Sequence, residues 1–262
     1  MPMRTLVTRG MRAVLGVLLL LGSSSPAMAA GVNLFWNDCG LGPSATRNRH
    51  FACDTNEGSH VLVGSFDSPL GLSQVVAMEG ILELESESCP LPNWWQLKNV
   101  GACRQTALSA NFFSLPQQFA CENFWQVQPT AGFAYQTGFR GDYRRVRILM
   151  VAAVPSGQGV PVSPGTEYYA FSLAISNTNT VGEGACAGCT DRVCIVLSEI
   201  SLFQPLETPG GNLILEFAHV SQVATWQGGT QLCGAIVDPP PPSSCTTPVL
   251  KRTWGQIKSL YR

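Results

Sequence analysis

The ten cysteines are the residues of this 262-residue chain with the clearest potential for chemistry. Three of them cluster in Cys186-Ala-Gly-Cys189-Thr-Asp-Arg-Val-Cys194. A zinc site usually takes four ligands in two separated pairs, and neither a histidine nor a second C-x-x-C accompanies this cluster. A redox C-x-x-C opens a helix after a strand, whereas this one lies in a glycine-rich stretch. The pattern favours structural disulfides over metal binding or redox chemistry, and we predict no metal and no cofactor.

Disulfide connectivity does not follow from cysteine positions alone. Cysteines that enclose a run of turn residues are the natural short-range partners. On this basis we predict the pairs Cys39–Cys53 and Cys103–Cys121, and we expect Cys194 to bond with Cys186 or Cys189. Each bond would restrict the unfolded chain and stabilise the fold by about 2–4 kcal/mol.

Carboxylates alternate along one short run, at Glu83, Glu85 and Glu87. On a strand these side chains share a face, and two of them could form the acid pair of a glycosidase. A secreted hydrolase is therefore one alternative. Such a row more often marks the solvated face of a sheet, which is the interpretation we favour.

Other catalytic and metal-binding signatures are weak. The three histidines lack H-x-H or H-E-x-x-H spacing, and no Gly-x-Ser-x-Gly nucleophile motif occurs. Residues 54–58 resemble the start of a calcium loop but lack the downstream glutamate, so an Asn/Gly turn is favoured over a calcium site. We predict no catalytic residue and do not expect an enzyme.

Trp94 and Trp95 are adjacent, so on a strand they would face opposite sides. One ring could then pack in the core while the other forms an exposed platform for a sugar or a peptide. Core packing of both rings is the favoured alternative. A carbohydrate- or peptide-binding module is thus the second functional hypothesis.

The strands that would position the cysteines, carboxylates and tryptophans follow a predicted export signal at the N-terminus. Residues 1–29 combine three arginines, a short apolar run over 13–22 and the sequence Ala27-Met28-Ala29, as in a cleaved signal peptide. The apolar run is too short to span a bilayer, and we predict no transmembrane segment in the mature chain. Removal takes away three of the 16 basic residues and none of the 17 acidic ones, which leaves a net charge of −4.

Composition narrows the class of protein further. Hydrophobic residues make up 45% of the chain, which excludes an intrinsically disordered protein. Only 13% of residues are charged and no long basic run occurs, so we expect no nucleic-acid partner. The 26 glycines and 18 prolines are spread along the chain and indicate many turns.

Alternation with period two predicts strands along most of the mature chain. Met78, Gly80, Leu82 and Leu84, for example, share one face. We expect nine strands, at 60–66, 78–85, 108–113, 133–139, 145–152, 168–176, 194–203, 212–217 and 222–226. No strand–helix–strand alternation appears, so the predicted fold is an all-β, two-sheet antiparallel β-sandwich over residues 30–237 with disulfides.

The chain after the sandwich differs in character. Residues 238–250 include four consecutive prolines and predict a stiff linker. In residues 251–262, Thr253 begins a capping-box pattern, and Trp254, Ile257 and Tyr261 follow at helical spacing. This short amphipathic helix would need a surface to pack against. We interpret it as a sorting or attachment tail.

Several stretches carry a resemblance to a known group. They are the C-terminal Thr-Trp-Gly-x-Ile-Lys-x-Leu-Tyr-Arg, Val32-Asn-Leu-Phe-Trp-Asn-Asp-Cys39, Phe51-Ala-Cys53, Val63-Gly-Ser-Phe66, Trp94-Trp95 and Gly184-Ala-Cys-Ala-Gly-Cys189. The chain resembles exported bacterial β-sandwich proteins with this tail and no assigned activity. The resemblance covers most of the mature chain and implies a secreted sandwich with a sorting tail.

The favoured function is an exported, non-catalytic surface or matrix protein positioned by its C-terminal tail. We expect it in the periplasm, at the cell surface or outside the cell. An extracellular polysaccharide or a cell-surface protein is the expected partner.

Overall fold

The computed structural model describes residues 31–98, 100–113, 119–216, 220–230 and 233. The predicted signal peptide (1–29), proline-rich linker (238–250) and C-terminal tail (251–262) lie outside these residues. The described part consists mainly of β-strands, with single 3₁₀ turns at η1 (Asn93–Trp95), η2 (Phe139–Gly141), η3 (Ser156–Gln158) and η4 (Val220–Gln222). None of the described helices is long and apolar enough to cross a membrane.

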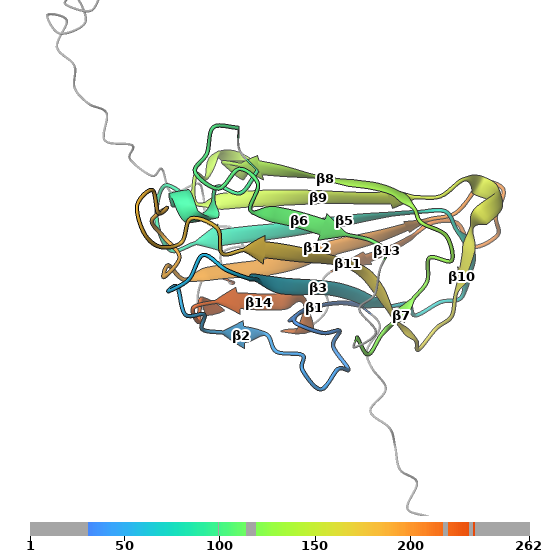
Figure 1. Cartoon of the computed structure of the whole chain (residues 1–262). Helices are drawn as coiled ribbons and strands as arrows, with labels where there is room; N and C mark the ends of the chain where they lie inside the picture. The colour runs from blue at the N-terminus through green and yellow to red at the C-terminus, as the bar shows by residue number, and fades with distance from the viewer. Residues whose placement is uncertain (1–30, 99, 114–118, 217–219, 231–232, 234–262) are drawn as a thin grey trace, which may run out of the picture.

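Two sheets form a sandwich (Figure 1). The first, sheet A, has the order β1 (Gly31–Trp36), β3 (Ser59–Asp67), β11 (Glu167–Ser176) and β6 (Leu108–Asn111), with β7 (Glu122–Asn123) parallel to β11. The second, sheet B, has the order β2 (Asn48–Arg49), β14 (Val223–Trp226), β12 (Val193–Phe203), β5 (Ala77–Ser86), β9 (Arg145–Ala153) and β8 (Thr130–Thr137). In addition, β13 (Leu213–Glu216) pairs with β12, and β4 (Leu72–Val75) pairs with β10 (Val160–Val162).

The core lies between the two sheets. Leu34 and Phe66 of sheet A and Leu82 and Ile200 of sheet B are fully buried in one apolar cluster. Alternation explains this packing, because every second side chain of each strand points to the facing sheet. The predicted apolar face of 78–84 is confirmed, since Met78, Leu82 and Leu84 are buried here.

Each of the nine predicted strands coincides with a strand of the structure, although the bounds differ by a few residues. The sequence analysis missed the short strands β2, β4, β7 and β10, and also β1. Strand β1 is buried on both faces, and on its outer side Glu167 bonds both to Asn33 of the strand and to Gly40 of the loop that follows. Its residues Val32, Leu34 and Trp36 alternate toward the core, but the apolar Phe35 on the other face obscures the pattern.

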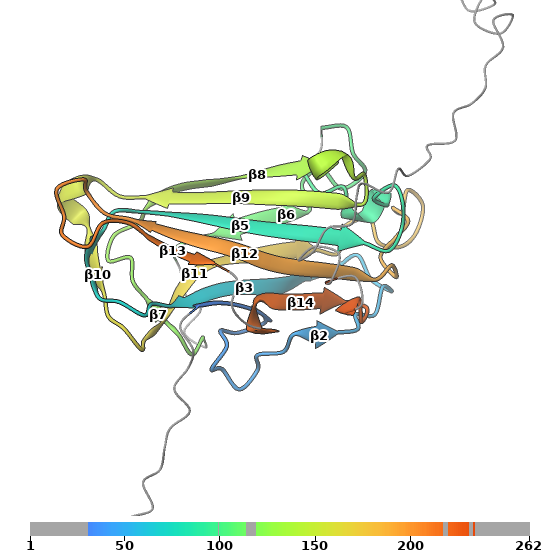
Figure 2. The same ribbon diagram turned by 180° about the vertical axis from the view of Figure 1, so that it is seen from behind.

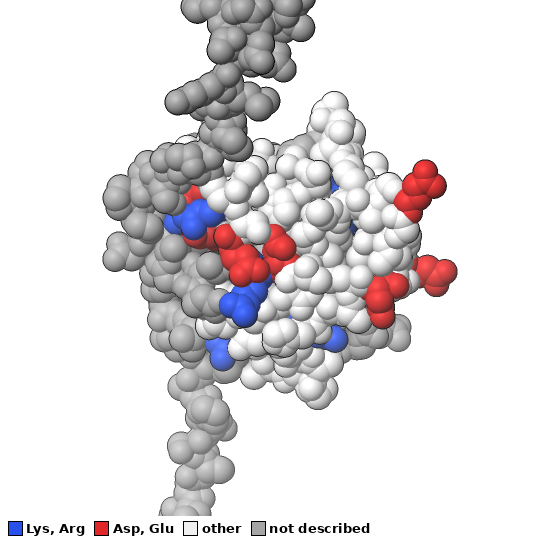
Figure 3. Space-filling view, turned by 90° about the vertical axis from the view of Figure 1, so that its left-hand side faces the viewer, with Lys and Arg blue, Asp and Glu red and all other residues white. Residues whose placement is uncertain are grey.

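Loops that cross between the sheets lie at both ends of the sandwich, and those that follow β2, β5 and β11 are on the left in Figure 1. Figure 3 looks onto this left-hand end: acidic and basic side chains lie side by side there, and most of the remaining surface is uncharged. No large field of one sign covers this face, which differs from the usual surface of a nucleic-acid-binding protein.

Candidate functional site

Trp94 and Trp95 do not form an exposed platform. Both lie in η1 rather than on a strand, and both are fully buried. Neighbours on a 3₁₀ helix are about a third of a turn apart, so both rings can face the core. Their ring centroids lie 4.9 and 5.3 Å from that of Trp226, and Trp94 Nε1 donates to Thr180 Oγ1 at 3.0 Å. The platform hypothesis is wrong at these residues, and the core-packing alternative is confirmed.

The Glu83-to-Glu87 row is not the solvated face that we expected. Glu83 and Glu85 are buried on the outer side of sheet B, and only Glu87 is exposed. Strand β9 supplies arginines directly opposite, with Arg147 paired to Glu83 and Arg145 to Glu85. Cross-strand neighbours of opposite charge attract each other. The sequence of one strand does not reveal which residues lie opposite it, so the burial of these glutamates could not be predicted.

Glu85 is the centre of a buried ion network. Its carboxylate lies 3.0 Å from Arg145 and 3.4 Å from Arg144, and both arginines also contact Asp142. Burial raises the pKa of Glu85, and the two arginine charges oppose this shift. Burial also disfavours ionisation of Asp142, but hydrogen bonds from Arg144 lower the pKa of that carboxyl. These acids are bound to cations and do not form an open acid pair.

A further buried carboxylate, that of Glu167, lies on the outer side of sheet A, and the sequence analysis did not single it out. Glu167 accepts hydrogen bonds from Asn33, Ser65 and the backbone amides of Gly40 and Leu41, over 2.6–3.1 Å. The amides come from the loop after β1, so Glu167 holds this loop against the sheet. A buried carboxylate needs such donors, and its role here is structural.

The cysteines form disulfides with other partners than those predicted. The observed pairs are Cys39–Cys121, Cys53–Cys189, Cys103–Cys186 and Cys194–Cys233, separated by 82, 136, 83 and 39 residues. The predicted pairs Cys39–Cys53 and Cys103–Cys121, and the bond of Cys194 to Cys186 or Cys189, are wrong. The assumption of local pairing fails because the bonds join segments that only the folded sandwich brings together.

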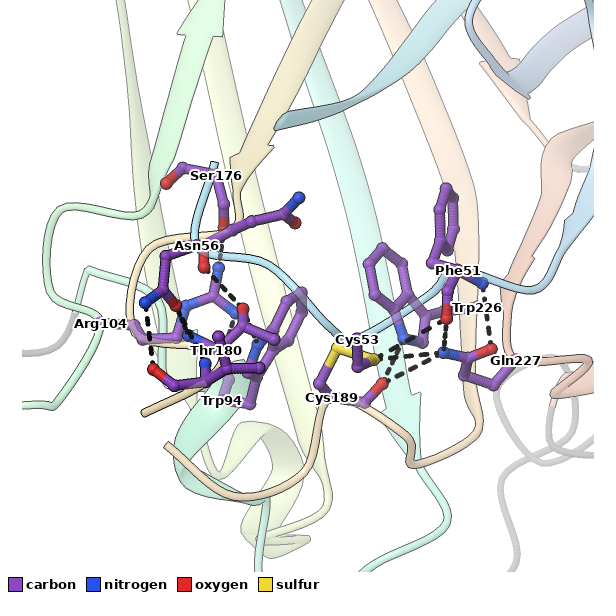
Figure 4. Close-up of a disulfide and its surroundings, with 12 residues drawn as sticks. Phe51, Cys53, Asn56, Trp94, Arg104, Ser176, Thr180, Cys189, Trp226 and Gln227 are labelled. Atoms are coloured by element: carbon purple, nitrogen blue, oxygen red, sulfur yellow. Dashed lines mark hydrogen bonds between the residues drawn. A yellow bond between two sulfur atoms is a disulfide. The ribbon is translucent and has the colours of Figure 1, made fainter. Parts of the chain in front are cut away.

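The C-x-x-C cysteines bind the loop between β11 and β12 to two other loops. Cys189 bonds to Cys53, in the segment before β3, and Cys186 bonds to Cys103, in the segment before β6. Figure 4 shows the first bond between Gln227 and Trp226 on one side and Trp94 and Thr180 on the other. Trp226 Nε1 donates to the carbonyl of Cys189 at 2.6 Å. These contacts make the cluster a structural clamp.

Metal-ligand geometry is not found in the described ranges: no group of three or more His, Cys, Asp or Glu side chains could hold an ion there. In the predicted turn at 54–58, Glu57 N donates to Thr55 Oγ1 at 3.0 Å. His60 packs on the rings of Phe51 and Trp226, at centroid distances of 4.1 and 5.2 Å. The sorting-tail residues Thr253, Trp254, Ile257 and Tyr261 lie outside the described residues.

The side of the sandwich between the edge strands β6 and β8 combines an unpaired strand edge with a groove. Strand β8 has the sequence TAGFAYQT, with no charged residue and no proline. It pairs with β9 on one side, in unbroken register from Thr130 to Thr137. Figures 1 and 2 both show β8 at the rim of sheet B.

The backbone of β8 alternates between bonding to β9 and facing outward. Gly138 N donates to Arg145 O at 2.9 Å, which extends the same register by one residue. Hydrogen-bonded pairs alternate in an antiparallel ladder, so residues 130, 132, 134 and 136 bond to β9. The N–H and C=O groups of residues 131, 133, 135 and 137 point away from it. Within the described ranges no hydrogen bond reaches these outward groups.

A groove of about 320 Å³ lies beside this edge. It is lined by residues of the β6 and β8 regions: Ala110, Asn111, Phe112, Phe113, Gln128, Pro129, Ala131, Gly132 and Phe133. The side chains that line it are uncharged and mostly apolar, with two amides among them, and exposed polar atoms line the groove as well. Its volume is at the lower end of the range for ligand pockets. The groove and the edge of β8 together form the candidate site, which the sequence analysis did not identify.

The described residues form a disulfide-braced all-β sandwich in which the outer edge of β8 is unpaired. No protein-family model matches the chain, and a search of curated proteins finds no match.

Proposed function

We propose that this chain is an exported surface or matrix protein that acts by binding rather than by catalysis and is positioned by its C-terminal tail. The observation that supports it best is the set of disulfides, which join segments 39 to 136 residues apart. Disulfides of this kind form and persist in oxidising compartments outside the cytoplasm.

Two features support binding over the secreted-hydrolase alternative. The acids Glu85, Asp142 and Glu167 are occupied by arginines or by several hydrogen-bond donors. On the described surface, the unpaired edge of β8 lies beside a groove that is lined by uncharged residues. Such a combination suits the docking of a partner better than the polarisation of a substrate.

Localisation is tested by replacing residues 251–262 with a Gly-Ser segment of equal length in cells that export the protein. We expect the tail-replaced protein to be released or to change fraction. A T253A/W254A/I257A/Y261A variant should behave in the same way, while a K251A/S259A control should not. An unchanged distribution of the tail-replaced protein would rule out the sorting role.

Export itself is tested by maleimide labelling of the protein in its cellular fraction. We expect no label before reduction and strong label afterwards. Thiols that react without reductant would place the protein in a reducing compartment and contradict export.

A further inference from the structure

We infer that the β8 edge binds an extended peptide segment of another protein, with apolar side chains at alternate positions, which adds to sheet B as a further strand. This inference rests on the proposed function in one respect, namely that the sandwich acts by binding. It does not depend on where the protein is located.

The first argument is the backbone of β8. Every second residue from 131 to 137 directs its backbone N–H and C=O groups away from β9, and no described residue forms a hydrogen bond with these groups. An extended peptide satisfies such groups by forming a new ladder of main-chain hydrogen bonds.

The second argument is that β8 lacks the features that keep edges from pairing. Natural edge strands are protected by charged side chains, proline, bulges or short length. Strand β8 is eight residues long, uncharged and regular. Other edge strands of the sandwich are shorter: β2 has two residues, β6 and β13 have four each, and β1 has six, with Thr46 bridging to its end.

The third argument concerns side chains. Phe133 pairs with Met150 and Tyr135 with Ile148, which are core residues, so the odd positions of β8 face the inside of the sandwich. A strand paired to β8 would point alternate side chains to this same side. There the groove offers Phe112, Phe113 and Phe133. On the outer side the segment would meet Ala134 and the exposed Leu149. On the inner side Lys98 Nζ lies 5.1 Å from the centroid of the Phe133 ring, and on the outer side Arg147 pairs with Gln136 of β8. Both of these nearby charges are positive, so a segment with apolar side chains at alternate positions and no basic residue fits best.

A second copy of this chain fits the groove less well. In a β8–β8 pair, Phe133 and Tyr135 of each copy would remain packed against their own core. The groove on both sides would then stay unfilled. A free segment has side chains to place in it, and we therefore assign the site to a segment of a partner protein.

The test uses the oxidised full-length mature chain and a fluorescent peptide, acetyl-Thr-Val-Thr-Phe-Thr-Val-Thr-amide. We expect saturable binding by anisotropy, and slowed amide hydrogen exchange at residues 131, 133, 135 and 137. The same peptide with alternate backbone N-methylation cannot form the ladder, and it should bind at least tenfold more weakly.

Two matched variants locate the binding. Ala131→Pro removes an outward N–H without removing a bond to β9, and should weaken peptide binding at least tenfold. A lysine substitution is then compared at two exposed alanines, Ala131 in the groove and Ala153 on the neighbouring strand outside it. The Ala153→Lys variant should bind the peptide like the wild type, whereas Ala131→Lys should bind it more weakly. Lysine is used at position 153 because proline there would break the ladder between β8 and β9. Circular dichroism and thermal unfolding confirm that each variant is folded.

Several results would overturn the inference: no saturation by the peptide, equal binding of the N-methylated peptide, or equal affinity of the Ala131 and Ala153 variants. A wild-type dimer in sedimentation that Ala131→Pro dissociates would assign the edge to a second copy instead. The peptide-binding assay uses purified protein and does not depend on localisation. A failed tail-replacement experiment would therefore leave the binding result valid, and a failed binding assay would leave the localisation result valid.

Discussion

Arg104 shows how this molecule buries a charge without a carboxylate. The side chain is 2% exposed, and its guanidinium lies 3.5 Å from the centroid of the Trp94 ring. It donates to the carbonyl oxygens of Trp94 and Ser176. Burial lowers its pKa to about 10, so it stays charged at neutral pH. The planar guanidinium is what permits stacking and two divergent hydrogen bonds at once.

We expect Arg104→Lys to lower the free energy of unfolding by roughly 1–3 kcal/mol, because an ammonium cannot keep the stacking and both carbonyl bonds. The control is Arg49→Lys, since Arg49 lies over Phe51 at a longer distance of 5.0 Å and is partly exposed. Its effect should be below about 0.5 kcal/mol. Urea unfolding measures both values, and equal effects would contradict the assigned role of Arg104.

Asp67 gives a pH-dependent prediction. Burial raises its pKa, the nearby Glu167 adds to the shift, and the amide of Gly165 opposes it. The pKa of Asp67 is therefore higher in the folded state than in the unfolded state. As the pH rises from the unfolded-state pKa through the folded-state pKa, ionisation of Asp67 lowers the free energy of unfolding. Asp67→Asn should therefore be more stable than the wild type at pH 7. The difference should disappear below about pH 3.9, where Asp67 is protonated in both states.

The measurement is the unfolding free energy of both proteins between pH 3 and 8. Asp54→Asn, at an exposed position, is the control and should show little difference at any pH. A constant advantage of Asp67→Asn over the whole range would show that the effect is not due to ionisation.

At the scale of elements, strand packing is tightest where β3 meets β11. A Cβ added at Gly64 would lie 2.3 Å from the ring of Phe171, which is fully buried. Gly64→Ala should therefore destabilise the protein by about 1–3 kcal/mol through overpacking. Gly132 of β8 has nothing within 4 Å of such a Cβ, so Gly132→Ala should be neutral or stabilising. Thermal unfolding of the two variants decides, and equal destabilisation would contradict the packing argument.

Strands were predictable where one face is buried and the other is not. The run 145–152 alternates in sequence because Val146, Ile148 and Met150 face the core while Leu149 and Val151 are more exposed. The candidate site could not be predicted, because no side-chain pattern in β8 indicates that one edge of the strand is unpaired. That property belongs to the backbone and depends on which strand has no neighbour. Likewise, the rings of Trp94 and Trp95 are buried by a 3₁₀ turn that alternation cannot indicate.

At the scale of the whole molecule, disulfides tie the ends and outer faces of the sandwich. In the chain-entropy description, a bond that closes a longer loop restricts the unfolded chain more. Cys103–Cys186 closes 83 residues and Cys194–Cys233 closes 39. We expect C103S/C186S to lower the unfolding free energy by roughly 2–4 kcal/mol, and by about 0.7 kcal/mol more than C194S/C233S.

Calorimetry of the two double variants under identical conditions provides the comparison. A larger loss for C194S/C233S would show that native contacts near that bond outweigh loop length.

The crossed connectivity also bears on how the chain matures. In the export that we propose, the chain emerges from its N-terminus, so Cys39 and Cys53 would meet the oxidant together before Cys121 or Cys189 has emerged. The nearest available partners are therefore the wrong ones, and a bond formed between them must later be exchanged for the native pairs. Such exchange takes seconds to hours depending on oxidant and isomerase. Productive folding of this sandwich is thus expected to require a disulfide isomerase in its compartment, and a host without one should accumulate scrambled protein.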